Sequence, residues 1–502
     1  MFESGSFALN ASSPRVEGSS TLLYALLNGF FIHALSLSFE AAIELSRSMT
    51  AGFVAATALL LFYILKDHIG RGYAVLLAGF YAVLPASYIE VFNGMEMCAF
   101  GFLLLLYFHL LGRAPWAALA VLPLVVLIRI EASFYLLIVM AAAWLFARRE
   151  DARTYLIHFA VLVAIAGALQ LFRLAYFESF FPNTVLAKMH PPYSAEGTAG
   201  FTQKSRGLGD YFQHYFGAIL VFVLVWAITR WQRLDRPEYF LIPAFAIFAL
   251  LSGEAWGYSA RMTLALLPTA LIAIVLISSK APMLKQGRVA LLIMLAMAGH
   301  AAGSLTDVRA FAFNLTVGTT LQDMKMRDVS NRDPSAPYRH GFYGVTPENY
   351  RLTGLAVVQL SDMLGLKQTA FAVPDVGGLG LCCQTVEVID IALLTDPELA
   401  REGYVDLDSY LKRKNPDMIQ VHGLWSRTSG LLSGENFQAG YQPLIYENTL
   451  IYLRNDHLDA LIGSGAAVST NPESIDWARV RYATEAVDRE HLKTLNVVWT
   501  SP

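Results

Sequence analysis

Two charged residues, Arg129 and Glu131, interrupt an otherwise apolar run from Pro115 to Phe146. A charge inside a membrane segment costs about 2.5–3.5 kcal/mol on insertion scales, so it usually faces a cavity or a partner. A spacing of two residues does not place both side chains on one helix face. We therefore expect a break in the helix, or a different partner for each residue. An internal ion-pair network and a polar substrate site both remain open.

A second group of polar residues follows the apolar segment that ends near Arg173. The sequence continues AYFESFFPNTVLAKMHPPY, which contains Asn183 and Lys188. Arginine and lysine at headgroup depth are suited to neutralise a lipid-linked phosphate. An arginine at a helix end also commonly extends its charge to the interface without binding a ligand. We predict a phosphate site here and keep the interfacial role as the alternative.

Two short turns carry further acids. Glu96 ends the turn NGME, and Glu254 lies in SGEAW, where it is followed by Trp256 and then by Arg261. Each acid alone also fits a structural role, because an acid at a helix start interacts favourably with the helix dipole. Since several separated segments place such residues between apolar blocks, we predict that they line one polar site.

The composition indicates the elements that position these residues. The 502-residue chain is 55% hydrophobic and 15% charged, against about 25% charged in ordinary globular domains. Apolar blocks fill residues 21–305, whereas residues 306–502 resemble a soluble domain. The net charge of −3 gives no argument for nucleic acid, and three cysteines suggest no disulfide framework. We predict a polytopic α-helical membrane protein with a C-terminal soluble α/β domain.

The apolar blocks give about ten spans, since a spanning helix needs about 20 residues. The run 115–146 would be about 48 Å long, too long for one crossing and short for two. We therefore expect a hairpin of two short helices with Arg129 and Glu131 at its apex. The other expected spans are residues 49–65, 72–90, 97–112, 155–175, 213–229, 238–252, 262–279 and 288–304.

Lysine and arginine gather in alternate loops, which the positive-inside rule assigns to the cytoplasm. The opposite side then holds the candidate site and the C-terminal domain. These basic loops contain Lys66 and Arg71; Arg113; Arg148, Arg149 and Arg153; Arg230, Arg233 and Arg236; and Lys280, Lys285 and Arg288.

The same rule places Met1 outside the cytoplasm. If the apolar block 21–38 were a span, every later loop would invert, so we interpret it as a helix at the outer interface. We expect an outer-face segment over residues 1–48, a transmembrane domain over 49–305 and an extracytoplasmic domain over 306–502. We also expect that an earlier spanning helix is missing from this chain: either the true start lies upstream of Met1, or the protein manages without that helix.

Alternating apolar residues and turn signals organise the C-terminal part. Asp375 and Asp390 follow expected strands and could line a sugar groove, but Asp equally favours turns and helix caps. Strands are expected at 370–374, 386–390, 417–421, 442–447 and 449–454, and helices at 353–364 and 405–413.

The order of these motifs resembles a known group. The segments are RVEGSSTLLYALL, FNGMEM, LIRIEA, FRLAYFESFFPNTVLAK, SGEAW with Arg261, VPDVGGLG and VIDIALLTD. Over nearly the whole chain they resemble the GT-C glycosyltransferases related to the mycobacterial terminal arabinofuranosyltransferases. The resemblance implies a polyprenyl-phosphate sugar donor, a glycan or glycoprotein acceptor, and a bacterial inner-membrane protein with its C-terminal domain outside the cytoplasm.

We assign roles to the candidate residues accordingly. The donor phosphate is assigned to Lys188, Arg173, Arg261 and Asn183, and contacts with the sugar or acceptor to Glu96, Arg129, Glu131, Glu254 and Trp256.

The sequence departs from the group at several points. An acidic motif precedes the VEG element in the family, but no aspartate precedes Asp67 here. The catalytic base is therefore unassigned, with Glu17 as a weak candidate. The glycine expected before Leu394 is Leu393.

Other functions remain open. A transporter or flippase of lipid-linked sugars would favour repeated halves of the membrane region, which the sequence does not show. A polysaccharide ligase or polymerase and a catalytically inactive homologue are further alternatives. No sequence pattern demands a metal, although a divalent cation is compatible with such a site.

Overall fold

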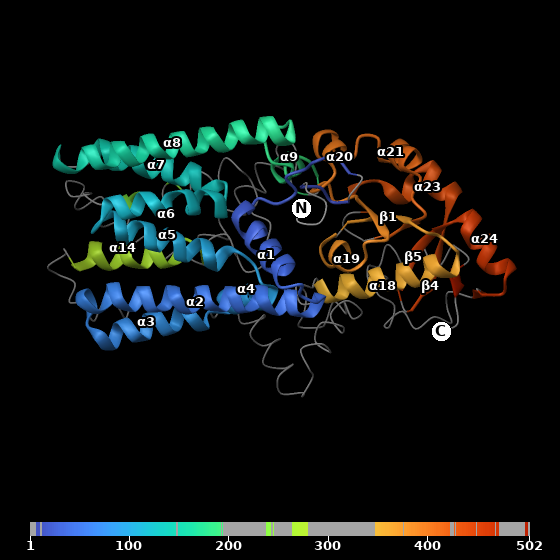
Figure 1. Ribbon diagram of the computed structural model, residues 1–502, viewed down its shortest axis with the longest axis horizontal. Helices are drawn as coiled ribbons and strands as arrows, with labels where there is room; N and C mark the ends of the chain where they lie inside the picture. The colour runs from blue at the N-terminus through green and yellow to red at the C-terminus, as the bar shows by residue number, and fades with distance from the viewer. Residues whose placement is uncertain are drawn as a thin grey trace. The chain divides into compact units, whose positions relative to one another are not determined.

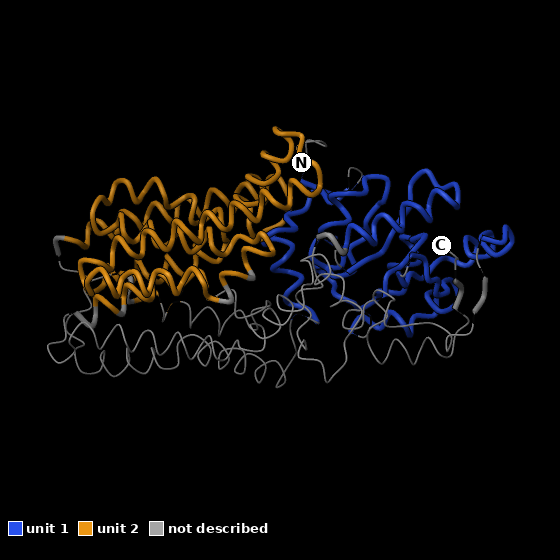
Figure 2. Tube along the Cα trace, turned by 90° about the horizontal axis from the view of Figure 1, so that it is seen from below, with its two compact units in different colours: residues 1–19, 181–195, 309–502 blue, residues 20–180, 196–308 orange. Residues whose placement is uncertain are grey.

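A computed structural model gives two compact units, and each is considered by itself. The first consists of residues 1–19, 181–195 and 309–502, and the second of residues 20–180 and 196–308 (Figure 2). The first unit therefore combines the C-terminal part with two segments from far earlier in the sequence. The structure describes residues 7–10, 13–146, 149–191, 193, 237–241, 244, 264–279, 347–374, 376–421, 426, 428–447, 449–466, 468–470 and 497–499.

The second unit is helical (Figure 1). Two of its described helices, α2 and α8, are long and apolar enough to cross a membrane by length and composition. Only 33% and 22% of their most apolar stretches are buried within the protein, so most of each stretch is not covered by other parts of the protein. The helices are α1 (Leu22–Ala34), α2 (Phe39–Ile69), α3 (Arg71–Val83), α4 (Pro85–Asn93), α5 (Met97–Leu111), α6 (Pro115–Ile128), α7 (Glu131–Phe146), α8 (Arg149–Phe177), η3 (Pro237–Phe240) and α14 (Leu267–Ser279).

Several expected spans are shorter or divided. The expected span 72–90 is wrong as one helix, because α3 ends at Val83 and α4 begins at Pro85. Proline lacks an N–H for the helix ladder and disfavours a helical residue before it, so a helix ends more readily here than it continues. The predicted helix in the block 21–38 forms as α1, which is too short to cross by itself. The total of ten spans stays a prediction.

The predicted hairpin between Pro115 and Phe146 is confirmed. Helix α6 ends at Ile128 and α7 begins at Glu131, because Arg129 adopts an extended backbone (φ −150°, ψ 125°). Arg129 contacts Glu96 at the start of α5, whereas Met140, late in α7, accepts a hydrogen bond at 3.6 Å from Tyr107, late in α5. Helices α6 and α7 therefore run in opposite directions.

The first unit is built on a mixed seven-stranded sheet with strand order β2-β1-β3-β5-β4-β7-β6. The five predicted strands are confirmed to within a few residues, while β6 and β7 were missed because they are very short. The strands are β1 (Thr369–Val373), β2 (Val386–Asp390), β3 (Met418–Ile419), β4 (Tyr441–Tyr446), β5 (Thr449–Arg454), β6 (Val468–Thr470) and β7 (Val497–Trp499).

Short helices surround this sheet. The two predicted helices are present as α18 and α21, although α18 begins several residues before the expected start at 353. Cys382 and Cys383 form a disulfide between adjacent residues, which the sequence analysis did not predict. The helices are α9 (Asn183–Ala187), α18 (Pro347–Met363), α19 (Gly377–Cys382), α20 (Pro397–Glu402), α21 (Leu407–Lys414), α23 (Glu435–Gly440) and α24 (Asn455–Gly463).

Candidate functional site

An ion cluster centred on Arg129 lies among the apolar helices of the helical unit. One guanidinium nitrogen, Nη1, donates to Glu96 Oε1 at 2.7 Å. The other face of the guanidinium forms a fork with Glu131, with Nη2–Oε1 at 2.5 Å and Nε–Oε2 at 3.1 Å. The Arg129 and Glu96 side chains are only 4% and 5% exposed. The structure therefore brings together three of the residues predicted from sequence.

The break between α6 and α7 explains this geometry. In a continuous helix, residues 129 and 131 would point to different sides. The extended backbone at Arg129 turns its side chain back towards Glu131, which opens α7. Glu131 stands in the first turn of α7, and Glu96 occupies the N-cap position of α5 without a side-chain capping hydrogen bond. Each acid therefore lies near the positive end of a helix dipole.

The turn that presents Glu96 is held by α1 and α2. Gly94 adopts a left-handed conformation (φ 64°), and its carbonyl accepts hydrogen bonds from Tyr24 at 3.0 Å and Ser46 at 2.8 Å. Thr50 donates to the Met95 carbonyl at 3.1 Å. A Cβ at Gly94 would come within 3.0 Å of Ser46 Oγ, so the close packing favours glycine. Glu96 is therefore positioned by two separate helices, α1 and α2.

Sequence reasoning missed a further acid in this region. Glu90 on α4 is completely buried, and its Oε2 accepts the backbone N–H of Met97 at 3.3 Å. A lone acid inside the apolar stretch PASYIEVF was the available signal. Glu90 fixes the start of α5 and so contributes to the position of Glu96.

The first unit gathers three segments that the sequence analysis singled out. The backbone N–H of Asn183 donates to the Glu17 carbonyl at 3.2 Å. The Asn183 side-chain amide donates to the carbonyls of Leu393, Leu394 and Asp396 at 3.0–3.1 Å. Asn183 thus joins the RVEG, PNTVLAK and VIDIALLTD segments, a role that fits an anchor more closely than a phosphate ligand.

The loop that receives Asn183 is itself tightly braced. Burial and the adjacent Asp396 carboxylate raise the pKa of Tyr410 well above its usual range. Its hydroxyl therefore stays protonated and donates to Asp396 Oδ2 at 2.6 Å. Tyr193 donates to the Ala392 carbonyl at 3.0 Å.

Asp390 organises the same loop. Its Oδ1 accepts the Ala392 N–H at 2.7 Å, and its Oδ2 accepts both the N–H and the hydroxyl of Thr395, at 2.6 and 2.7 Å. These bonds fit the turn-forming alternative for Asp390. Asp375, its predicted companion, lies outside the described residues.

The remaining predicted residues belong to one or the other unit or lie outside the described residues. Lys188 follows α9 in the first unit, whereas Arg173 is buried on α8 in the second. Glu17 is buried in the first unit. Arg261, Glu254 and Trp256 lie outside the described residues. Within the described ranges, no group of three or more His, Cys, Asp or Glu side chains is arranged to hold a metal ion.

Comparison with known proteins gives no family assignment. No family model matches the sequence, and no curated protein matches it. Among solved structures, the chain is similar to ArnT from Cupriavidus metallidurans, whose crystal structure is bound to undecaprenyl phosphate. The match covers 82% of this chain and 74% of that chain, at 13% identity and a TM-score of 0.35. A TM-score of this size does not establish a shared fold.

Proposed function

We propose that this protein is an integral-membrane glycosyltransferase of the GT-C type that uses a polyprenyl-phosphate sugar donor. The acceptor would be a cell-envelope glycan or glycoprotein outside the cytoplasm of a bacterium. The observation that carries the proposal is the buried Glu96–Arg129–Glu131 cluster. Charges buried between apolar helices are expensive, and they commonly mark polar substrate sites. The ordered motifs in the sequence support this function, and arabinofuranose or another pentose is the sugar that their resemblance favours.

The reaction would follow ordinary glycosyl transfer. A general base removes the proton of an acceptor hydroxyl, and that oxygen attacks the anomeric carbon. The bond from this carbon to the phosphate oxygen breaks, and its electron pair leaves with the polyprenyl phosphate. Cations stabilise the negative charge on the leaving group. We assign this role to Lys188, Arg173 and Arg261.

The acidic cluster would orient the sugar or acceptor. Carboxylates accept hydrogen bonds from sugar hydroxyls, and Arg129 fixes Glu96 and Glu131 so that little reorganisation is needed. Glu254 and Trp256 are further candidates for this role. Asn183 enters the proposal as the residue that holds the Lys188 segment. The base stays unassigned, with Glu17 as the weak candidate.

A transfer assay tests the proposal. Purified full-length protein in proteoliposomes is supplied with polyprenyl-phosphate pentose or hexose and an acceptor glycan, and released polyprenyl phosphate is measured. We expect release from one donor, reduced roughly 100-fold by Glu96→Gln. Glu44→Gln is the matched control, because its carboxylate is 67% exposed and pairs only with Arg47 among the described side chains. Release by Glu96→Gln at the wild-type rate would contradict a role of the Glu96–Arg129–Glu131 cluster in sugar transfer.

The same assay separates the alternative functions. A flippase would move the labelled lipid across the bilayer without cleaving the sugar from its phosphate. A catalytically inactive homologue would bind the donor and release nothing. A ligase or polymerase would transfer whole glycans rather than single sugars.

A further inference from the structure

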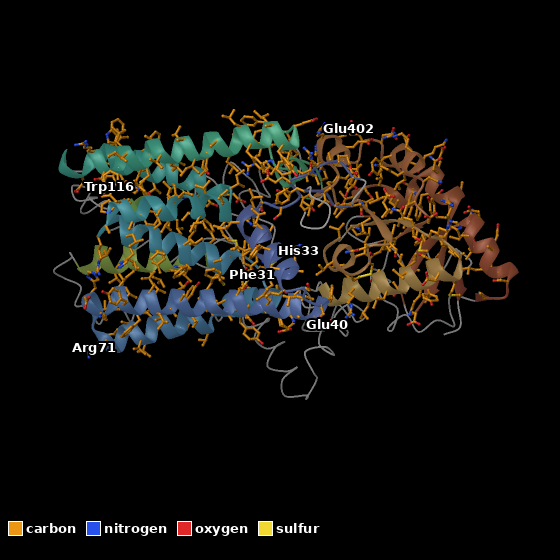
Figure 3. The ribbon with its side chains drawn as sticks, in the orientation of Figure 1. Phe31, His33, Glu40, Arg71, Trp116 and Glu402 are labelled. Atoms are coloured by element: carbon orange, nitrogen blue, oxygen red, sulfur yellow. A yellow bond between two sulfur atoms is a disulfide. The ribbon has the colours of Figure 1, made fainter. Side chains whose placement is uncertain are left out.

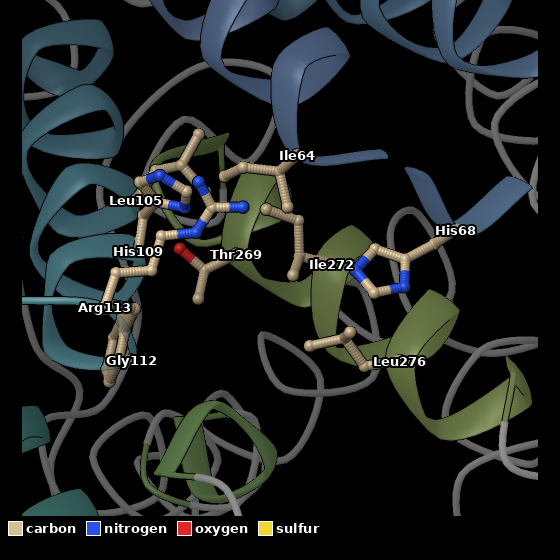
Figure 4. A pocket seen from close by; sticks show the side chains of 10 residues that line it. Ile64, His68, Leu105, His109, Gly112, Arg113, Thr269, Ile272 and Leu276 are labelled. Carbon is tan, nitrogen blue, oxygen red and sulfur yellow. The ribbon is translucent and has the colours of Figure 1, made fainter. Parts of the chain in front are cut away.

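A pocket lies in the helical unit near the far end of α5 from the Arg129 cluster (Figure 4). Its volume is about 270 Å³. From Glu96 to His109 the helix rises by about 20 Å, so the pocket is separate from the cluster. It is lined by Ile64 and His68 from α2, Leu105, Phe108 and His109 from α5, Gly112 and Arg113 from the following turn, and Thr269, Ile272 and Leu276 from α14.

The polar lining of this pocket combines one permanent cation, Arg113, with side chains that can donate hydrogen bonds. His68 and His109 lie in the last turns of their helices, and Arg113 follows α5. Tyr63 contacts both His109 and Arg113: the rings of Tyr63 and His109 are 6.1 Å apart, and Arg113 Nη1 donates to the Tyr63 hydroxyl at 3.4 Å. No acid occurs among the described residues that line the pocket. The lining therefore suits an anion.

Thr269 gives an independent indication of a ligand. It is fully buried, and its hydroxyl has no hydrogen-bond partner among the residues that the structure describes. Figure 4 shows this hydroxyl turned towards the Arg113 guanidinium. Buried hydroxyls are normally satisfied, and buried Thr57 on α2 donates to the carbonyl four residues earlier at 2.7 Å. The Thr269 hydroxyl makes no such bond within the described residues, so it can donate a hydrogen bond to a ligand.

The simplest alternative is that these basic residues stabilise helix ends and bind no ligand. Histidine and arginine in a last turn interact favourably with the helix dipole even without a ligand. That alternative accounts for His68, His109 and Arg113 individually, but it does not account for the unsatisfied hydroxyl of Thr269.

We propose that this pocket binds a phosphate group, with Arg113 and the two histidines facing its charge and Thr269 donating to one oxygen. Its volume is near the lower end for ligand sites, which suits a headgroup-sized anion. Basic pockets between membrane helices on the cytoplasmic side bind phospholipid headgroups, and the predicted topology places this end there. A phospholipid headgroup and free phosphate share the required chemistry. The inference goes beyond sugar transfer and does not depend on it.

Binding to full-length protein in nanodiscs of a neutral lipid tests the proposal. One arm titrates inorganic phosphate by calorimetry, and the other titrates phosphatidylglycerol and measures retained lipid by native mass spectrometry. We expect Arg113→Gln and Thr269→Val each to weaken binding in at least one arm by roughly tenfold. Binding in the lipid arm alone identifies a headgroup site, whereas binding in both arms identifies a general phosphate site.

The control is Arg71→Gln. Arg71 begins α3, is exposed and does not line the pocket (Figure 3). The Arg71→Gln substitution removes one positive charge from the same basic end of the helical unit, so we expect binding within about twofold of wild type. Thr269→Val should also leave the melting temperature unchanged or raised, because it removes an unsatisfied hydroxyl at nearly constant volume. Equal binding by wild type, Arg113→Gln and Thr269→Val, or no binding in either arm, would overturn the proposal.

Discussion

Replacing Arg129 by methionine gives the sharpest test of the ion cluster. The guanidinium is 4% exposed and binds two carboxylates, at 2.7 and 2.5 Å. Removing one partner of a buried ion pair costs about 3–5 kcal/mol, because the other charge stays buried without it. Here two carboxylates share the arginine. We therefore expect a loss of about 5 kcal/mol in the free energy of unfolding.

A triple variant separates charge from packing. Arg129→Met combined with Glu96→Gln and Glu131→Gln removes all three charges and keeps the side-chain volumes similar. We expect it to recover stability to within about 2 kcal/mol of the wild type, since well-packed neutral replacements of buried ion pairs are often tolerated. Thermal and denaturant unfolding of the full chain in detergent measures both effects.

An exposed ion pair supplies the control. Arg413 pairs with Glu398 and is 58% exposed, so Arg413→Met should cost less than about 1 kcal/mol. A loss below about 1 kcal/mol for Arg129→Met, or a triple variant less stable than the single one, would refute this reasoning.

Three further predictions concern the first unit. Asn183→Ala removes the side-chain donor of the Leu393 and Leu394 carbonyls and one of two donors to the Asp396 carbonyl, which also accepts the Ala400 N–H. We therefore expect a loss of about 2–3 kcal/mol in the free energy of unfolding and faster amide hydrogen exchange across residues 392–396. Leu393 is buried and has a left-handed backbone, with φ 73°. Because glycine adopts this conformation without strain, denaturant titration should give Leu393→Gly a free energy of unfolding about 1 kcal/mol higher than that of Leu393→Ala. Hydrogen bonding from Arg454 lowers the pKa of Asp456. The ionised carboxylate therefore stabilises the fold above about pH 4 and loses that effect as the pH falls further. The melting temperatures of wild type and Asp456→Asn should converge at low pH.

Much of the local structure follows from the sequence. The length of the run 115–146, with two charges near its middle, predicts the hairpin because one crossing cannot contain it. The strands β1, β2, β4 and β5 follow from short apolar runs bounded by turn residues. Pro85 indicates the division between α3 and α4, but residues 72–90 are largely apolar throughout, and this composition favoured one continuous span.

The sequence could not predict in the same way which segments of the chain make up the first unit. Asn183 contacts residues more than 200 positions away in the sequence, and no local pattern reports such a pairing. An asparagine after proline is compatible with a ligand contact and with an anchor, and only the three carbonyls around it favour the anchor. Likewise, the spacing of two residues predicted a helix break as one of two possibilities, but it could not reveal that the extended backbone at Arg129 turns its side chain back onto Glu131.

The most direct test of the central claim is sugar transfer by the triple variant at a temperature where it and the wild type are both folded. The wild type should release polyprenyl phosphate from a lipid-linked pentose or hexose, and the triple variant should bind the lipid but release at least ~100-fold less. Equal release by both proteins would show that the charges of the cluster serve the fold alone. The absence of release from every donor, by folded wild-type protein, would contradict a glycosyltransferase function.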